Sequence, residues 1–377
     1  MTIYEVLNIK LEKEFSDLPK HLYKNDPNWI STLDSDIKSI FDSTINPFFK
    51  HGKCTRWILM NDQKQTIGRI AAFIDFEKNK DGQIPYGGMG FFECIDDERA
   101  SNLLLDTAKE WLKKHGMQAM YGPINFGEND KFWGLLVDGF QSPSYGMNYN
   151  PPYYKELLEK YGFSKAYDQL TNVLNPKKPL PERFTRISDW VRHKKDYSFQ
   201  HFKSAQKEKF FADFIEIYND AWDGFENFTP IDLPTIRDSF RQMKPIMDEK
   251  IIWFAYHNNE PIAFVICMPD VNQILKHIKG DLNLFNKLKF LWVKKTKTID
   301  RIRITVMGCK KKFQNHGIES ALIRCLQEEV LPRQTINEVE LAWVGDFNSK
   351  MLAIHNATGA VKSKVHRTYK YSFDEKL

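Results

Sequence analysis

The two halves of the chain repeat one pattern of elements, and this repeat restricts the fold more than any other feature. In the first half, an apolar run begins at Trp57, turns at NDQKQ and ends at Asp75. In the second half, a similar run begins at Trp253, turns at HNNE and ends at Asp270. Short apolar runs on both sides of a polar turn predict a β-hairpin. A hairpin that recurs with nearly equal length indicates two copies of one fold.

The segments after each hairpin also correspond. Residues 88–96 predict a strand that leads into an amphipathic helix ending near Gly116, and residues 301–309 predict a strand that leads into a helix starting near Ile318. A strand, a short helix and a final strand then complete each copy. The order hairpin, strand, helix, strand, helix, strand requires a mixed sheet with helices on both faces. The predicted fold class is therefore α/β (mixed α+β).

The boundary between the copies is predicted at residues 176–180, because NPKKPLPERF (175–184) contains three prolines in ten residues. A chain of 377 residues is long enough for two domains of about 150 residues each, here 1–175 and 176–377. Residues 122–150 contain five glycines and six aromatic residues. They predict a long ordered loop used for binding or for packing the two domains.

Composition excludes several classes of protein. With 42% hydrophobic and 27% charged residues, the chain can bury a core and is not of the disordered or fibrous type. It contains no apolar run near the ~20 residues that span a bilayer, and no signal sequence is expected at its N-terminus. Five cysteines without C-x-x-C spacing argue against a disulfide framework or a zinc site. We therefore expect a cytoplasmic protein without a metal.

Positive charge is concentrated in one stretch of the second half. Residues 1–175 carry 20 basic and 24 acidic side chains, whereas residues 176–377 carry 34 and 25. Residues 276–312 alone carry 12 basic and 2 acidic side chains. This imbalance predicts an anion-binding function there. Nucleic acid is an unlikely partner, because the basic stretch is single and the other half is acidic.

The segment QNHGIESA lies between a predicted strand and a predicted helix of the second half. Such a junction directs free backbone N–H groups and the positive helix end toward one point, where they can hold a pyrophosphate. Gly317 would allow close approach of the backbone, and Lys310, Lys311 and Lys312 would add charge. The alternative interpretation is an ordinary capped helix preceded by solvated lysines.

The run KKFQNHGIESALI resembles the acyl-CoA-binding loop of the GNAT N-acyltransferases, whose pattern is Q/R-x-x-G-x-G/A. Gln314 and Gly317 match this pattern, and Glu319 replaces its second small residue. GNAT chains often carry an Asn, a Tyr seven residues later, and then Gly-Phe. This chain has Asn348 and then His355 in place of the Tyr. The residues that the resemblance implies for CoA binding are Met307, Gly308, Cys309, Gln314, Asn315, His316, Gly317, Ile318, Glu319, Ser320 and Asn348.

The first half resembles the same superfamily. Its segment YYKELLEKYGF (153–163) is similar to the closing GNAT helix, so the resemblance covers nearly the whole chain as two tandem GNAT folds, each a mixed sheet flanked by helices. The first copy lacks the glycine loop and carries acidic residues in its place, so it is expected not to bind CoA. Segments such as INPFFKHGK, GRIAAFID and GFFECIDD resemble a bacterial group of mostly uncharacterised tandem GNAT-like proteins.

The resemblance implies transfer of an acyl group from acetyl-CoA or a longer acyl-CoA to a primary amine. His355 could protonate the leaving sulfur, since an unperturbed histidine titrates near neutrality; it could also simply pack. Asp223 and Glu226, in the acidic and aromatic segment 219–232, could accept the ammonium proton or could be solvated. Backbone groups of Met307, Gly308 and Cys309 would hold the pantetheine arm and polarise the thioester carbonyl. Cys309 as an acylated nucleophile is disfavoured, because no activating base is identifiable.

Other functions remain open at this point. Residues 284–297 interleave lysines with large apolar residues, which suits a peripheral contact with an anionic membrane or a lipid, or else a charged helix that covers the core. A lipid contact would make a long acyl donor and a lipid-like amine, such as a sphingoid base, reasonable substrates. A second class is a non-catalytic protein that binds or senses acyl-CoA, supported by Glu319 and the missing Tyr. Peptidoglycan aminoacyl-tRNA transferases are a distant analogy. No motif indicates the oligomeric state.

Overall fold

A computed structural model describes residues 1–79, 84–224, 230–278 and 281–373. The strands form one mixed sheet with the order β1-β2-β3-β4-β5-β13-β7-β12-β11-β10-β9-β8, and β6 pairs with β13 beside this path. The elements of the first half are β1 (Thr2–Glu5), α1 (Ile9–Leu22), α2 (Asp34–Ile40), β2 (Gly52–Met60), β3 (Thr66–Asp75), β4 (Tyr86–Cys94), α3 (Glu98–Lys114), β5 (Ala119–Gly122), β6 (Leu135–Asp138), α4 (Tyr153–Tyr161) and β7 (Ser164–Leu174). Those of the second half are α5 (Glu182–Arg192), β8 (Tyr197–His201), α6 (Lys207–Trp222), α7 (Leu233–Met243), β9 (Ile252–His257), β10 (Glu260–Pro269), α8 (Asn272–Leu275), α9 (Leu284–Thr296), β11 (Arg301–Cys309), α10 (Ile318–Val330), β12 (Glu338–Gly345), α11 (Ser349–Ala357) and β13 (Val361–Ser372).

The predicted order of elements is confirmed in both halves. The hairpins are β2–β3 and β9–β10, followed by β4, α3 and β5 in one half and by β11, α10 and β12 in the other. Local chemistry explains the helices. Asp97 caps α3 by accepting a hydrogen bond from the Ala100 N–H at 2.8 Å, and Leu104, Ala108 and Leu112 bury one face of the helix. The predicted loop 122–150 differs in one respect, because it contains the short strand β6.

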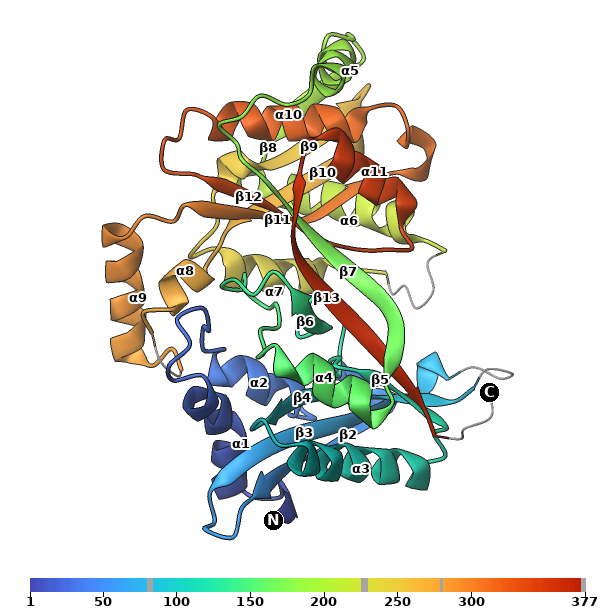
Figure 1. The fold of residues 1–377 in the computed structure, drawn as a ribbon. Helices are drawn as coiled ribbons and strands as arrows, with labels where there is room; N and C mark the ends of the chain where they lie inside the picture. The colour runs from blue at the N-terminus through green and yellow to red at the C-terminus, as the bar shows by residue number, and fades with distance from the viewer. Residues whose placement is uncertain (80–83, 225–229, 279–280, 374–377) are drawn as a thin grey trace.

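The last strand of each half lies against the sheet of the other half. β7 pairs with β12 from Val339↔Leu174 to Gly345↔Gln169, and β13 pairs with β5 from Tyr369↔Gly122 to Ser372↔Ala119. β7 and β13 also pair with each other along nearly their full length. Figure 1 shows these two strands running side by side from the upper lobe to the lower one. The predicted boundary at 176–180 falls just after β7, so each half of the sequence extends into both lobes.

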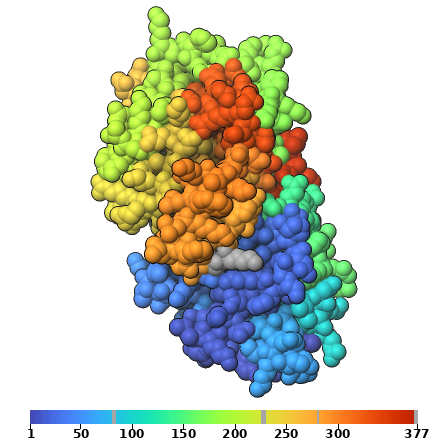
Figure 2. Space-filling model, turned by 90° about the vertical axis from the view of Figure 1, so that its left-hand side faces the viewer, coloured from blue at the N-terminus to red at the C-terminus, as the bar shows by residue number. Residues whose placement is uncertain are grey.

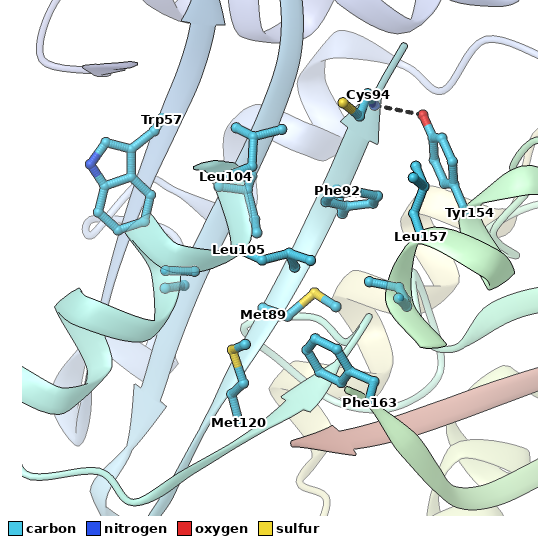
Figure 3. Packing of buried hydrophobic residues seen from close by; sticks show 14 of the residues in the cluster. Trp57, Met89, Phe92, Cys94, Leu104, Leu105, Met120, Tyr154, Leu157 and Phe163 are labelled. Atoms are coloured by element: carbon cyan, nitrogen blue, oxygen red, sulfur yellow. Dashed lines mark hydrogen bonds between the residues drawn. The ribbon is translucent and has the colours of Figure 1, made fainter. Parts of the chain in front are cut away.

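Both lobes bury apolar side chains on the two faces of the sheet. In the first half, α3 and α4 cover one face, where Leu104, Met89 and Leu157 belong to one buried cluster. The Tyr154 hydroxyl accepts a hydrogen bond from the Cys94 N–H at 2.7 Å (Figure 3) and donates one to the Glu93 carboxylate at 2.9 Å. In the second half, α10 covers one face and α6 covers the other. Among the described residues, no helix has the length and apolarity needed to cross a bilayer.

Candidate functional site

The two central strands of the second half pair over only part of their length, and we call the region beyond their last pair the wedge. β11 and β12 pair in parallel only from Arg301↔Glu338 to Ile304↔Leu341, although β11 continues to Cys309 and β12 to Gly345. Thr305 is exposed and Val306 and Met307 are half-buried, despite their position in the middle of the sheet. A central strand normally buries such residues, so solvent reaches β11 in the region where its pairing with β12 has ended.

A β-bulge at Thr305 shapes one wall of this wedge. Val306 pairs with Ile266 on β10 whereas Ile304 pairs with Cys267, so Thr305 is the extra residue. Its hydroxyl donates to the Ile266 carbonyl at 3.2 Å. Bulges redirect backbone groups and side chains next to functional sites. Beyond the bulge, the peptide groups of β11 that β10 does not bind face the wedge, where β12 offers no partner.

Gly308 allows an aromatic side chain to approach the far end of β11. A Cβ atom at this position would lie 2.6 Å from the ring of Trp222, on α6. Trp222 stacks on Tyr218, with 4.5 Å between ring centroids, and both belong to an aromatic cluster on this face of the sheet. Gly308 is therefore required for Trp222 to pack against β11. Trp222 and Tyr218 line β11 on its α6 side.

The loop between β11 and α10 has the strand-loop-helix geometry predicted from the sequence. Gln314 holds the turn by donating from Nε2 to the Cys309 carbonyl at 3.2 Å. Asn315 and Gly317 have left-handed φ angles of 66° and 80°. In the part of the chain that the structure describes, the first backbone bond of α10 runs from the Ala321 N–H to the Gly317 carbonyl, so the preceding amides of the helix have no backbone acceptor. These amides form an anion-binding end.

Two features of this loop differ from the expected phosphate site. A Cβ atom on Gly317 would lie 2.8 Å from Ile187 Cγ2 of α5, so its φ angle and helix packing already require a glycine at this position. Glu319 lies in the first turn of α10, where its carboxylate interacts with its own N–H. Burial raises the pKa of Glu319 above its usual value, which reduces the cost of its charge there.

The lysines before the loop contribute less free charge than predicted. Lys310 is buried and forms ion pairs with Glu216 at 2.5 Å and Glu260 at 3.0 Å. Lys311 pairs with Asp223 at 2.9 Å. Acidic groups thus neutralise two of the three cations that were expected to attract a phosphate.

His355, on α11, is buried and contacts a residue of the first half. Its Nδ1 accepts a hydrogen bond from Asn172 Nδ2, on β7, at 3.0 Å. Burial lowers the pKa of His355 to about 4. The pKa of His355 therefore lies well below the near-neutral value expected from an unperturbed histidine. As a consequence, the ring is neutral at pH 7. With Nδ1 accepting, the ring proton resides on Nε2, which remains available as a donor.

The other predicted residues are placed as follows. Met307, Gln314, Glu319, Ser320 and Asn348 are half-buried, Gly308, Cys309 and Ile318 are buried, and Asn315 and His316 are exposed. The side chain of Asn348 accepts from the Met351 N–H at 3.1 Å, so it caps α11. Burial raises the pKa of the Cys309 thiol, which disfavours a thiolate nucleophile.

Of the two predicted acceptor-side acids, the structure describes only Asp223. Asp223 is exposed at the end of α6 and is occupied by its ion pair with Lys311. Glu226 lies outside the described residues. Among the residues that are described, no group of three or more His, Cys, Asp or Glu side chains is arranged to hold a metal ion.

Sequence reasoning missed two acids that the loop 122–150 brings to the same side of β11. Asp130 interacts electrostatically with Arg303 of β11, and both Glu128 and Asp130 interact with Tyr218 of α6. Both carboxylates reach solvent, yet the surrounding protein excludes enough water to raise the pKa of each. The GEND segment that carries them has no periodic pattern, so only the folded chain reveals this proximity.

The corresponding wedge of the first half is filled by the chain itself. β4 and β5 stop pairing after Gly88↔Tyr121. The Ile124 N–H then donates to the Met89 carbonyl at 2.8 Å, and a Cβ atom on Gly90 would lie 1.9 Å from the Ile124 carbonyl oxygen. The space that remains open in the second half is therefore occupied in the first.

A cavity of about 100 Å³ lies between the first half and α8 of the second half. Glu93 reaches it and is held by hydroxyl groups of Tyr23 at 2.6 Å and Tyr154 at 2.9 Å. Arg69 lies 3.5 Å from the same carboxylate. Burial raises the pKa of Glu93, and the neighbouring Arg69 opposes this shift. The cavity thus combines a buried polar floor with walls from both halves.

Comparison with solved structures identifies the architecture. A tandem GNAT protein from the clavulanic acid biosynthesis pathway superimposes with a TM-score of 0.56 at 11% identity, and the match covers 100% of this chain and 99% of that one. A GCN5-related N-acetyltransferase from Sphaerobacter thermophilus gives a TM-score of 0.52 at 9% identity and covers 100% and 97% of the two chains. The chain has a tandem GNAT fold. The second copy of this fold contains β11, β12, α10 and α11.

Sequence comparison gives two full-length similarities. The chain is 29% identical over 369 residues to a protein of Caulobacter vibrioides named bacterial ceramide synthase, covering 95% of this chain and 94% of that protein. It is 27% identical over 368 residues to protein YghO of Escherichia coli, covering 95% and 92%. No protein-family model matches the chain.

Proposed function

We propose that this protein is an acyl-CoA-dependent N-acyltransferase whose reaction takes place in the second GNAT copy. The observation that carries the proposal is the end of β11–β12 pairing beyond Ile304↔Leu341, where Thr305 is exposed, together with the first-turn amides of α10 that have no backbone acceptor. The wedge suits the extended pantetheine arm, and the helix end suits the pyrophosphate. The first copy is proposed not to bind CoA, because Ile124 occupies its wedge.

The reaction needs no covalent enzyme intermediate. The free amine attacks the thioester carbon, a C–N bond forms, the C–S bond breaks, and one amine proton ends on the CoA sulfur. Peptide N–H groups of β11 beyond the Thr305 bulge are proposed to bind the carbonyl oxygen as it gains charge. Cys309 is not required, which agrees with its raised thiol pKa.

His355 is proposed to donate a hydrogen bond from Nε2 to the leaving sulfur. Because its pKa is about 4, it acts as a neutral donor and not as an imidazolium acid. Asn172 is proposed to be a positioning residue, since it fixes which ring nitrogen carries the proton. On the acceptor side, Asp130 and Glu128 replace Asp223 as proposed proton acceptors, because they lie on the side of β11 that carries Arg303.

A lipid-like amine is the proposed acceptor, and a long-chain acyl-CoA the proposed donor. The similarity to a protein named bacterial ceramide synthase supports a sphingoid base as the amine. The cavity between the halves, with Trp29, Ile30 and Leu275 among its walls, is proposed to receive part of such a molecule.

A thiol-release assay tests both levels of the proposal. Purified protein is offered acetyl-CoA or palmitoyl-CoA together with spermidine, a short alkyl amine or sphinganine, and free CoA thiol is recorded. Release with palmitoyl-CoA and sphinganine alone supports the lipid acceptor. Release with a small amine and not with sphinganine contradicts the lipid acceptor and keeps the acyltransferase.

A non-catalytic acyl-CoA-binding protein is the second candidate. The carboxylate of Glu319 at the helix end and the low pKa of His355 favour it. Calorimetric binding of palmitoyl-CoA without thiol release from any amine would support this candidate, and absence of both binding and release would contradict the two candidates together.

A further inference from the structure

Helix α9 (Leu284–Thr296) turns its large apolar side chains away from the protein. Only Val293 is buried in this helix, and it packs in the cluster that also contains Leu275 and Ile278. Five apolar side chains of the helix are 57–77% exposed: Leu284, Phe285, Leu288, Leu291 and Trp292. A scattered exposed leucine is ordinary, but five on thirteen residues form a contiguous patch.

Helical geometry gathers these five residues on one side. With successive residues about 100° apart around the axis, they fall within an arc of about 120° that lies opposite Val293. α9 is therefore apolar on two sides: a narrow one that attaches it to the protein and a broad one that has no cover among the described residues. Of the two interpretations of residues 284–297, a helix that only covers the core does not account for the five exposed apolar side chains.

Basic residues border the exposed face. α9 contains four lysines and no acidic residue, and Lys297 follows directly. Lys287 and Lys294 lie at one edge of the apolar arc and Lys289 at the other, and Lys295 projects from within it. All except Lys289 are exposed. An apolar arc between cationic edges matches the surface of an anionic bilayer, where apolar side chains enter the acyl boundary and lysines meet phosphates.

We propose that α9 docks this protein on an anionic membrane surface. The charge pattern argues for this occupant over a second copy of the chain, because two α9 helices facing each other would bring eight lysines together without an acidic partner. Docking rests on the exposed face alone and goes beyond the proposed acyl transfer. Failure of one proposal therefore leaves the other in place.

The position of α9 gives the docking a direction. Figure 2 faces this side of the molecule, where the orange atoms of the α8–α9 region lie at the surface beside the blue atoms of the first half. The cluster beneath α9 includes Ile30, Tyr145 and Leu275, which also line the cavity between the halves. A membrane bound at the outer face of α9 would be separated from that cavity by the helix itself and by the cluster beneath it.

Vesicle sedimentation tests the proposal with the full-length protein. Phosphatidylcholine vesicles are compared with vesicles that also contain phosphatidylglycerol. We expect the protein to sediment with the anionic vesicles and to be released by salt. The double variant Leu288→Ser/Leu291→Ser is expected to partition at least about a hundredfold more weakly, from the lost burial of two leucines. Lys287→Gln/Lys295→Gln is expected to weaken binding to anionic vesicles about twentyfold.

Matched controls come from another exposed part of the chain. Leu7 and Ile9 are 79% exposed at the start of α1, so Leu7→Ser/Ile9→Ser removes similar apolar surface far from α9 along the chain and is expected to bind as the parent does. Thermal unfolding checks that each variant folds. Equal vesicle binding by the α9 variants and the parent would overturn the proposal. A parent dimer that the α9 variants convert to monomer, with no vesicle binding, would overturn it in favour of a second copy.

Discussion

Replacing Glu340 with Gln should destabilise the protein by about 3 kcal/mol at pH 7, because two cations would remain buried without their partner. Glu340, on β12, is 1% exposed and lies 2.8 Å from Lys364 Nζ and 3.3 Å from Arg303 Nε. Burial opposes its charge, but Lys364 and Arg303 outweigh this effect and lower the pKa of Glu340 from 4.5 to about 2. A shift of this size corresponds to about 3 kcal/mol. Removal of one member of a buried pair typically costs ~3–5 kcal/mol, in agreement.

The assay is urea unfolding followed by far-UV circular dichroism, with Glu338→Gln as the control. Glu338 lies on the same strand and pairs with Arg301 at 2.6 Å, but its side chain is 30% exposed. More exposed pairs contribute ~0–1 kcal/mol, so this variant should lose at most about 1 kcal/mol. Adding Lys364→Met to Glu340→Gln should recover part of the stability, because it removes one unpaired charge.

The pH dependence gives a second measurement of the same group. The pKa of Glu340 is lower in the folded protein than in the unfolded chain, so its contribution is present above about pH 5 and disappears as the pH falls toward 2. The stability difference between the parent and Glu340→Gln should shrink over that range. A difference below about 1 kcal/mol at pH 7, or one independent of pH, would refute the electrostatic reasoning.

Three further predictions concern the proposed site. His355→Phe should lower turnover at least about tenfold with little change in the Kd of acyl-CoA. Asn172→Leu should have a smaller effect of the same kind. Unchanged turnover of the His355→Phe variant in steady-state kinetics would remove His355 from the mechanism. Asp130→Asn should abolish the acidic limb of the pH-rate profile. We expect this limb above the usual pH range of an aspartate, because burial raises the pKa of Asp130. An unaltered limb would point to another base. Glu319→Gln should tighten CoA binding about threefold in calorimetry, because it removes a negative charge from the helix end, and weaker binding would place the pyrophosphate elsewhere.

Local sequence patterns predicted much of the fold because they depend on neighbouring residues. The hairpin at Trp253 and the helix from Ile318 follow from residues a few positions apart. Strand exchange was not predictable in this way, since Tyr369 pairs with Gly122 across most of the chain and no periodicity specifies such a partner. β6 escaped prediction because four residues in a glycine-rich loop give no pattern.

The candidate site was predictable only where a motif carries it. The loop from Gln314 to Gly317 was located from its residues, and the structure places it at the expected junction. The contact between His355 and Asn172 spans 183 positions, and the packing of Ile187 on Gly317 joins two helices. Burial changed the expected chemistry of His355, because a sequence shows which group can titrate but not how much water surrounds it.

The crossing of β7 and β13 determines when this protein can fold during synthesis. The ribosome releases β5 and β7 long before β13, yet β13 lies between them in the sheet. Until β13 emerges, both strands expose unsatisfied edges, which are sites of aggregation. We expect the nascent chain to depend on chaperones until β13 is released. Deletion of β13 should leave the facing edges of both lobes open, so a C-terminal truncation would affect the half of the molecule that is encoded first.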